Sequence, residues 1–389
     1  MVASKKIGLL ILLLGCQLFV SAQTYTNPIL AEDYSDPDII RVGSTYYMTA
    51  SSFHHVPGLP LLSSTDLVHW HLQGYALDSL VPYLHFKQPQ HGGGVWAPSI
   101  RHHNNRFYIY YPDPDFGIYM IHAKDFKGPW SAPVLVASGK GLIDPCPFWD
   151  DNGNAYLVHA LAGSRAGIKS VLYLQSMNDS GTKVLGSRQL IYDGHGIDPT
   201  IEGPKLYKQH GWYYIFAPAG GVKEGWQVVL RSTNINGPYE RKVVMEQGQS
   251  TTNGPHQGAW VTTQHNENWF LHFQDRGAFG RIMHLQPMTW ENDWPIIGAP
   301  QSKGIGNPVV QYRVPKGLLK DTIKENNSLT HFQWNGNPEW FWKQSFYNEQ
   351  RFYAVTKKDP SQNLWNFPAI YNRKINASYP NATFTLDFH

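Results

Sequence analysis

Five segments of the chain repeat one pattern of apolar and polar positions. In each, a short apolar strand leads into a polar turn, and a strand rich in aromatic residues follows. The turns VGS, HNN, DNGN and QHG carry Gly or Asn, which tolerate positive φ, so these segments predict β-hairpins. The segments are SDPDIIRVGSTYYMTAS, WAPSIRHHNNRFYIYYP, IDPCPFWDDNGNAYLVHA, IEGPKLYKQHGWYYIFAP and HQGAWVTTQHNENWFLHFQ.

The spacing of these hairpins predicts the fold. A weaker repeat follows them, as SSTDLVHW, HAKDFKGPW, QSMNDSG and RSTNINGPY, and predicts the outer strands of each unit. Four strands per unit and five units predict an all-β chain with a five-bladed β-propeller, which we expect over residues 23–300. Short aromatic strands also recur in β-sandwiches, but five units in matching phase favour the propeller. The aromatic strands centre about fifty to sixty residues apart, near Tyr46, Phe107, Tyr156, Tyr213 and Trp269.

The phase of the repeats brings charged residues together. The first strand of each propeller blade lines the central axis, so equivalent starts of these strands meet at one mouth of the channel. The equivalent residues are Asp36, Trp96, Asp144, Glu202 and His256. Three carboxylates in one partly desolvated pocket raise the pKa of at least one of them, which favours chemistry over stability as the explanation. Glycoside hydrolysis needs one protonated carboxylic acid and one ionised carboxylate, and a third could orient and tune the acid.

Each carboxylate has a simpler interpretation when it is taken alone. An Asp before Pro, as at Asp36 and Asp144, most often forms a turn with its own backbone. Only the shared phase of the repeats favours more than a turn. Asp38 lies on the same strand face but further along the channel, and we expect a supporting role for it. Asp150 and Asp151 lie in a predicted turn, where we expect them to be solvated.

The N-terminal residues 1–22 predict a secretory signal peptide. Two lysines precede an apolar region from Ile7 to Leu14, and the small-residue motif VSA precedes Gln23. The apolar run is too short to span a bilayer well, and no other membrane span is predicted. Lipoprotein processing at Cys16 is the alternative. Because Leu14 stands where a small residue is preferred, we favour cleavage after VSA and a secreted or periplasmic protein.

Composition agrees with this fold and excludes several functions. Aromatic residues make up 14% of the chain and charged residues 16%, with 35 Gly and 27 Pro, which suits strands joined by tight turns. A net charge of +3 is too small and too scattered for a nucleic-acid partner. Cys16 would leave with the signal peptide, so Cys146 would stand alone, and neither a disulfide framework nor a cysteine zinc site is predicted.

The motifs resemble those of glycoside hydrolase family 43, whose members are inverting enzymes on a five-bladed propeller. They run from about Asn27 to Trp294 and read NPIL…YSDPDIIRVGSTYYMTASSF, GLPLLSSTDLVHW, GVWAPSIRHHNNRFYIYY, IDPCPFWDDNGNAYLV, IEGPKLYKQHGWYYIFAPAGG and NGPHQGAW. The later run HFQDRGAFGRIMHLQPMTWENDWPIIG is similar to the branch that holds β-xylosidases and α-L-arabinofuranosidases. The resemblance implies an exo-acting glycosidase that releases arabinofuranose or xylose from plant cell-wall polysaccharides such as xylan.

The resemblance also implies catalytic roles. Asp36 matches the general base that activates water, and Glu202 matches the general acid that protonates the leaving oxygen. Asp144 matches the carboxylate that tunes and orients the acid. A non-catalytic glycan-binding propeller is the rival interpretation, because aromatic pockets bind sugars without cleaving them. The presence of all three carboxylates disfavours it.

Four further residues match the family's pocket. Phe53 and Trp96 match aromatic walls of the first sugar subsite, and Arg281 matches an arginine that contacts the sugar. His256 matches an axial histidine that lies near a cation, often calcium, in relatives. Calcium prefers oxygen ligands, so we expect either a water molecule between the histidine and a structural calcium in the channel, or no metal. No cofactor is required.

The pattern changes after the propeller. GAPQSKGIGNPVVQYRVPKG is rich in Gly and Pro, and we expect a linker over residues 301–325. THFQWNGNPEWFWKQSFYNEQRFYAVTKK then predicts strands and resembles the start of the β-sandwich that follows the propeller in this branch. We expect a truncated β-sandwich domain over residues 326–389, because the family's sandwich is much longer and this chain stops at TFTLDFH. In the family, a loop of this sandwich can close over the active site.

Overall fold

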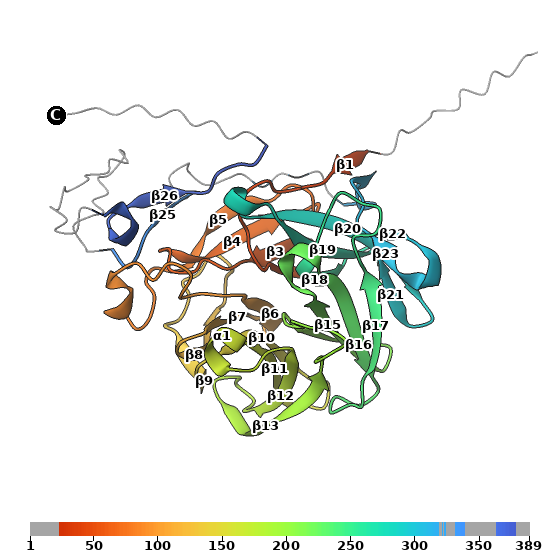
Figure 1. Cartoon of the computed structure of the whole chain (residues 1–389), viewed down its shortest axis with the longest axis horizontal. Helices are drawn as coiled ribbons and strands as arrows, with labels where there is room; N and C mark the ends of the chain where they lie inside the picture. Colours follow the sequence, from red (N-terminus) through yellow and green to blue (C-terminus); the bar gives the residue numbers. More distant parts are fainter. Residues whose placement is uncertain (1–22, 319–320, 322, 324–330, 339–362, 379–389) are drawn as a thin grey trace, which may run out of the picture.

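The described residues form a five-bladed β-propeller in the computed structural model, as predicted (Figure 1). The structure describes residues 23–318, 321, 323, 331–338 and 363–378. The predicted signal peptide, residues 1–22, lies outside them. Each blade is built from four antiparallel strands that follow one another along the chain.

The strands occupy the predicted repeats in order. Blade one contains β2 (Asp38–Val42), β3 (Thr45–Thr49), β4 (Gly58–Ser64) and β5 (His71–Leu77). Blade two contains β6 (Ser99–His103), β7 (Arg106–Asp113), β8 (Gly117–Ala123) and β9 (Val134–Ser138). Blade three contains β10 (Leu142–Trp149), β11 (Ala155–Leu161), β12 (Val171–Met177) and β13 (Val184–Asp193). Blade four contains β14 (Lys205–Gln209), β15 (Trp212–Ala219), β16 (Trp226–Ser232) and β17 (Glu240–Met245). Blade five contains β18 (His256–Thr262), β19 (Asn268–Asp275), β20 (Arg281–Glu291) and β21 (Trp294–Ile297).

The aromatic strand of each repeat is the second strand of its blade and packs against both neighbouring blades. In β7, Phe107, Ile109 and Tyr111 pack toward blade one, whereas Tyr110 packs toward blade three. Successive side chains of a strand point to opposite faces, so a strand covered on both sides needs apolar residues at nearly every position. The core accordingly consists of five apolar clusters, one between each pair of adjacent blades.

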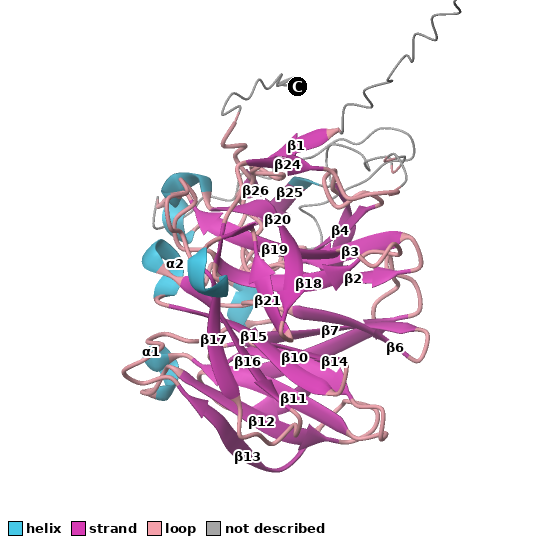
Figure 2. Ribbon diagram, turned by 90° about the vertical axis from the view of Figure 1, so that its right-hand side faces the viewer, coloured by secondary structure: helices cyan, strands magenta, loops and turns pink. Residues whose placement is uncertain are grey.

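The ring closes between blades five and one without a shared strand. Before blade one, the Asn27 amide donates to Leu285 O (2.9 Å) and accepts from Leu285 N (2.8 Å). Leu30 and Met283 form an isolated β-bridge beside this contact. Further out, β1 (Thr24–Thr26) pairs with β24 (Gln311–Arg313), which follows blade five (Figure 2). Segments from both ends of the propeller therefore hold the ring shut.

The segment after blade five lies along the propeller. The short strands β22 (Ala299–Pro300) and β23 (Gly306–Asn307) extend the blade-four sheet, where β23 pairs in parallel with β17. The two α-helices in the described part, α1 (Gly163–Ala166) and α2 (Gly221–Glu224), have one turn each. Within the described ranges, no helix has the length and apolar character needed to cross a membrane.

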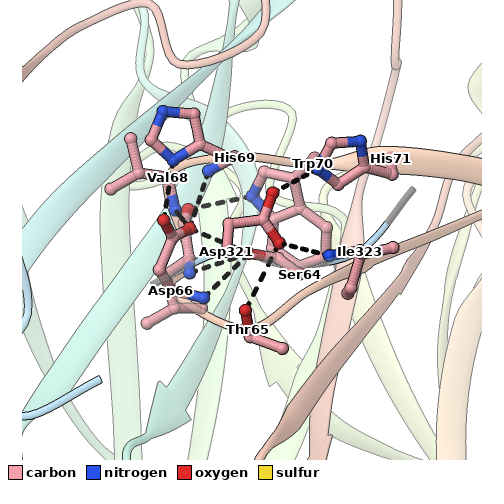
Figure 3. Close-up of polar contacts among 10 residues, drawn as sticks. Ser64, Thr65, Asp66, Val68, His69, Trp70, His71, Asp321 and Ile323 are labelled. Atoms are coloured by element: carbon pink, nitrogen blue, oxygen red, sulfur yellow. Dashed lines mark hydrogen bonds and ion pairs between the residues drawn. The ribbon is translucent and has the colours of Figure 1, made fainter. Parts of the chain in front are cut away.

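Asp321 attaches the chain beyond the propeller to blade one (Figure 3). Its carboxylate accepts hydrogen bonds from Thr65 Oγ1 (3.3 Å) and Ile323 N (3.2 Å), and it pairs with His71 Nε2. The turn that leads into β5 is itself held by Asp66, whose carboxylate accepts two backbone amide hydrogens. The outer edge of blade one is therefore a fixed docking surface for the later chain.

A two-stranded sheet of β25 (Phe332–Trp334) and β26 (Tyr371–Arg373) also lies beside blade one (Figure 1). Trp334 forms a β-bridge with Val56, and Asn337 exchanges two hydrogen bonds with the Leu80 backbone (2.7 and 2.9 Å). The predicted β-sandwich is described only in this part, since residues 339–362 and 379–389 lie outside the described ranges.

Candidate active site

A pocket of about 130 Å³ opens where the first strands of the five blades begin. All seven predicted site residues line it, together with four that the sequence argument did not propose as site residues. The seven are Asp36, Phe53, Trp96, Asp144, Glu202, His256 and Arg281, and the four are Ala97, Ile143, Val222 and Gln257. The shared phase of the repeats therefore corresponds to a shared position in space.

Several pocket residues have a strained backbone. Asp36, Phe53 and Asp144 have φ of 56°, 51° and 55°, in the left-handed region that residues with a side chain rarely adopt. Such a conformation costs on the order of 1 kcal/mol or more per residue, and it is concentrated at functional sites. All three of these residues line the pocket.

Asp36 is anchored through both carboxylate oxygens. Ser51 Oγ donates to Oδ2 (2.6 Å), and Arg281 NH1 donates to Oδ1 (2.8 Å). The side chain is nearly buried, so these two donors replace most of its hydration. Both oxygens act as acceptors, as those of an ionised carboxylate do. A fixed carboxylate of this kind can take a proton from a water molecule in the pocket.

Asp144 lies deeper, and its pKa is raised to about 8, first by burial and then by the negative charges of Glu202 and Asp36. The amide of Gly203, which donates to Asp144 Oδ2 (2.7 Å), opposes the shift. Gly203 has φ of +60°, and a Cβ there would lie 2.9 Å from Gln257 Cδ, so this approach requires glycine. With this pKa, Asp144 keeps its proton near neutral pH.

Glu202 faces the pocket from the start of blade four. Its Oε1 lies 2.9 Å from His256 Nε2, and its backbone N donates to Pro218 O (3.1 Å). The Glu202 side chain remains 25% exposed, whereas Asp144 is 2% exposed, so Glu202 is the member of the pair within reach of a ligand. Glu202 is therefore the carboxyl group that can exchange a proton with a ligand in the pocket.

Phe53 and Trp96 stand on a backbone clamp between blades one and two. Phe53 and Val95 exchange two main-chain hydrogen bonds (2.9 and 3.0 Å), and the Trp96 indole donates to Gly92 O (2.6 Å). Gly94 has φ of +93°, and a Cβ there would lie 2.4 Å from Phe53 O. The glycine-rich loop before Trp96 is thus a tight wall of the pocket, and its geometry fixes the two aromatic rings.

Arg281 and the loop before Asp36 hold each other in place. Asp33 Oδ1 accepts from Arg281 N (2.8 Å), and Tyr34 N donates to Arg281 O (3.0 Å). The Arg281 guanidinium lies 4.7 Å from the centroid of the Phe273 ring. Sequence reasoning missed the partners Ser51 and Asp33. Asp33 precedes the first repeated segment and Ser51 is its last residue, so neither occupies the start of a strand, where the repeats bring side chains together.

His256 does not fit direct coordination of calcium. Its Nε2 is occupied by Glu202, and its buried Nδ1 has no hydrogen-bond partner among the described residues. In the described part of the chain, no group of three or more His, Cys, Asp or Glu side chains converges in a way that could hold a metal. Since calcium prefers oxygen ligands, an ion at this place would have to be held through water, which stays a prediction.

Asp38 lies beneath the pocket. It is fully buried, and its Oδ2 accepts from Ile100 N (2.8 Å) and Arg101 NH1 (2.6 Å). Arg101 NH2 also donates to the sulfur of the buried Cys146 (2.9 Å). These contacts join the inner strands of blades one, two and three and stabilise the floor of the channel.

The expectation of a solvated Asp150 is wrong. This residue is 7% exposed and accepts from Lys208 Nζ (2.6 Å) and Tyr213 Oη (2.7 Å). Both partners come from blade four, which covers the blade-three turn. Asp151 is the exposed member, with 86% of its side chain accessible.

Comparisons with known proteins agree with this geometry. A family model described as glycosyl hydrolases family 43 matches residues 25–295. A putative β-xylosidase of Xylanibacter ruminicola is 42% identical over 81% of this chain and 59% of its own length. A non-reducing end α-L-arabinofuranosidase of Bacteroides ovatus is 32% identical over 75% of this chain and 57% of its own length. The chain thus spans less than two thirds of the length of these relatives.

A comparison with solved structures also finds members of this family. The crystal structure of a xylan β-1,4-xylosidase from Bacillus halodurans superimposes with a TM-score of 0.72 at 29% identity. The match covers 82% of this chain and 66% of that one. The propeller therefore has a known architecture.

Proposed function

Because the chain belongs to glycosyl hydrolase family 43, we propose that it is an exo-acting, inverting glycosidase that releases xylose or arabinofuranose from plant cell-wall glycans such as xylan. One observation carries the proposal. Three carboxylates from three blades meet in a single pocket, and burial and the neighbouring negative charges raise the pKa of Asp144 to about 8. That pocket therefore holds an acid and a base at the same pH.

In the proposed reaction, Glu202 donates its proton to the glycosidic oxygen as the bond from this oxygen to the anomeric carbon breaks. A water molecule attacks that carbon from the opposite face, and Asp36 takes the proton that the water loses. No covalent intermediate forms, so the configuration at the anomeric carbon is inverted. Asp144 restrains Glu202, because its Oδ2 binds the backbone amide of Gly203, the residue that follows Glu202 (2.7 Å). Acid and base need a separation of about 6.5–9.5 Å to admit the water.

The pocket suits the end of a glycan chain. Its volume of about 130 Å³ accommodates one pentose rather than a run of sugars. Phe53 and Trp96 offer apolar surfaces to the sugar ring, and Arg281 offers hydrogen-bond donors to its hydroxyl groups. Several relatives are named β-xylosidase and one is named α-L-arabinofuranosidase, so both pentoses are candidate substrates. These relatives are hydrolases, and the non-catalytic alternative gains no support from them.

The proposal is tested by aryl glycoside hydrolysis. We expect the chain to release the phenol from aryl β-D-xyloside, aryl α-L-arabinofuranoside or both. Glu202→Gln lowers kcat/KM by about 10²–10⁴-fold, because it keeps the shape of the acid but removes its proton. Glu240→Gln is the matched control, since Glu240 lies on an outer strand and pairs with Arg231 (2.9 Å) away from the pocket. Equal activity of Glu202→Gln and wild type would refute the assignment of the acid.

We also propose that the protein is exported. The support is the sequence of residues 1–22, with its lysines, apolar run and VSA motif. N-terminal sequencing of the processed protein distinguishes the two routes. A mature chain that begins at Gln23 indicates a signal peptidase, and a lipid-modified chain that begins at Cys16 would refute simple secretion.

A further inference from the structure

The chain beyond the propeller reaches the loop that precedes Asp36. Residues 371–377 run beside residues 31–34, and Ala377 N donates to Ala31 O (2.6 Å). Asn335 follows β25 of the small two-stranded sheet, and its Oδ1 lies 2.7 Å from His54 Nε2. His54 is the residue after Phe53 in the pocket wall. The chain beyond the propeller therefore contacts the residues before Asp36 and the residue after Phe53.

Lys374 makes the central contact. Its ammonium group donates to the backbone oxygen of Asp33 and lies 4.6 Å from the centroid of the Tyr34 ring. Burial lowers the pKa of Lys374, while the charges of Asp33 and Glu32 oppose the shift. A buried ammonium is costly unless it is hydrogen-bonded and faces negative charge or an aromatic ring. The ammonium group of Lys374 is therefore held at a defined position by Asp33 and Tyr34.

The residues that Lys374 holds lead directly to the pocket. Asp33 Oδ1 binds Arg281 N (2.8 Å) and Ser35 Oγ (2.8 Å), and Tyr34 N binds Arg281 O (3.0 Å). The Arg281 guanidinium then donates to Asp36 Oδ1 (2.8 Å). Displacement of the Asp33 backbone would thus move the arginine and release one oxygen of the carboxylate.

We propose that Lys374 is a positioning residue for the pocket: it holds the Asp33–Tyr34 backbone, which fixes Arg281 and, through it, Asp36. The role in turnover rests on the proposed glycosidase function. The segment after the propeller is accordingly a part of the machinery that orients the base, in addition to any loop that covers the pocket.

The test compares three variants at 25 °C. Lys374→Met keeps the aliphatic stem but removes the donor and the charge, and we expect kcat/KM to fall about tenfold, since small displacements of catalytic groups cost rate steeply. Lys374→Arg restores a charged donor and stays within about twofold of wild type. Arg373→Met is the matched control, because it removes one positive charge at the next residue, which lies over Phe332 (5.8 Å) instead of Asp33. It also stays within about twofold.

Melting temperatures separate positioning from stability. A purely structural lysine would lower the melting temperature but leave kcat and KM of the folded enzyme unchanged, and this result would overturn the proposal. Equal losses in Lys374→Met and Arg373→Met would overturn it as well. If Lys374→Met does not fold, Lys374→Gln replaces it in the same comparison.

A binding measurement tests the role of Lys374 even if the proposed glycosidase function is wrong. If the wild type hydrolyses neither aryl glycoside, binding of free xylose and L-arabinose is measured by saturation-transfer NMR. Because Arg281 lines the pocket, the proposal then requires weaker binding by Lys374→Met than by Arg373→Met. Equal binding by the two variants would overturn the role of Lys374 independently of catalysis.

Discussion

Replacement of Asp144 by Asn makes the protein more stable and less active. The folded carboxyl group has a pKa of about 8, whereas the unfolded one titrates at 3.8. Because the folded pKa is raised, the stabilising effect of the bound proton is fully present below pH 3.8 and is lost as the pH rises to about 8. Each pH unit in this window costs about 1.4 kcal/mol, so the native state loses up to about 6 kcal/mol.

An asparagine at this position cannot ionise and avoids this cost. Its oxygen can still accept from Gly203 N and Gln257 Nε2, which both donate to Asp144 Oδ2 in the wild type (2.7 and 3.4 Å). We expect a gain of about 2 kcal/mol at pH 7, less than the full value because the native structure relaxes around an ionised buried carboxylate. We expect kcat/KM to fall at least about 10²-fold, because an amide at this position cannot exchange a proton with the site.

Thermal unfolding at pH 4, 5.5 and 7 tests this reasoning. The difference between Asp144→Asn and wild type should vanish near pH 4 and grow toward pH 7. Asp150→Asn is the control in the same blade: burial opposes ionisation of Asp150, but hydrogen bonds from Lys208 and Tyr213 hold its pKa below the usual value. The ionised Asp150 carboxylate therefore stabilises the native state above pH 3.8, so Asp150→Asn should be less stable than wild type at pH 7. A stability difference for Asp144→Asn that does not change with pH would refute the assignment.

Two further substitutions test the interior. Arg101→Met leaves Asp38 fully buried without its charged partner. It should lower the free energy of unfolding, measured in urea, by about 3–5 kcal/mol. A loss below about 1 kcal/mol would show that the pair is replaceable. Burial lowers the pKa of His272 to about 4 and that of His284 well below 6.5, so the wild type loses stability as the pH falls below 6.5. His284→Leu should therefore gain about 2 kcal/mol over wild type between pH 7.5 and pH 5, and parallel unfolding curves across this range would contradict the expectation.

The repeat made the fold and the pocket predictable. Gly and Asn turns and doubly buried aromatic strands recur at a fixed spacing, and this spacing determines which residues share a position in each blade. Asp36, Asp144 and Glu202 could therefore be brought together without knowledge of any single contact. Their roles as base, modulator and acid stay predictions until the variants are assayed.

The supporting contacts could not be predicted in this way. Asp150 was misjudged because its partners Lys208 and Tyr213 belong to the next blade. Lys374 is separated from Asp33 by 341 residues and belongs to no repeat. Such contacts depend on how two segments pack against each other. In the sequence, each is represented by a single polar residue, which does not indicate its partner.

Closure of the ring between the first and last blades has a consequence for biosynthesis. Asp36 and its partner Arg281 are 245 residues apart, and a ribosome that adds 5–20 residues per second needs roughly 12–50 s to make the intervening chain. During this interval the face of blade one that packs on blade five is uncovered. The pocket is thus incomplete until blade five is made, and a chain released before its fifth blade would carry the carboxylate without the arginine that pairs with it.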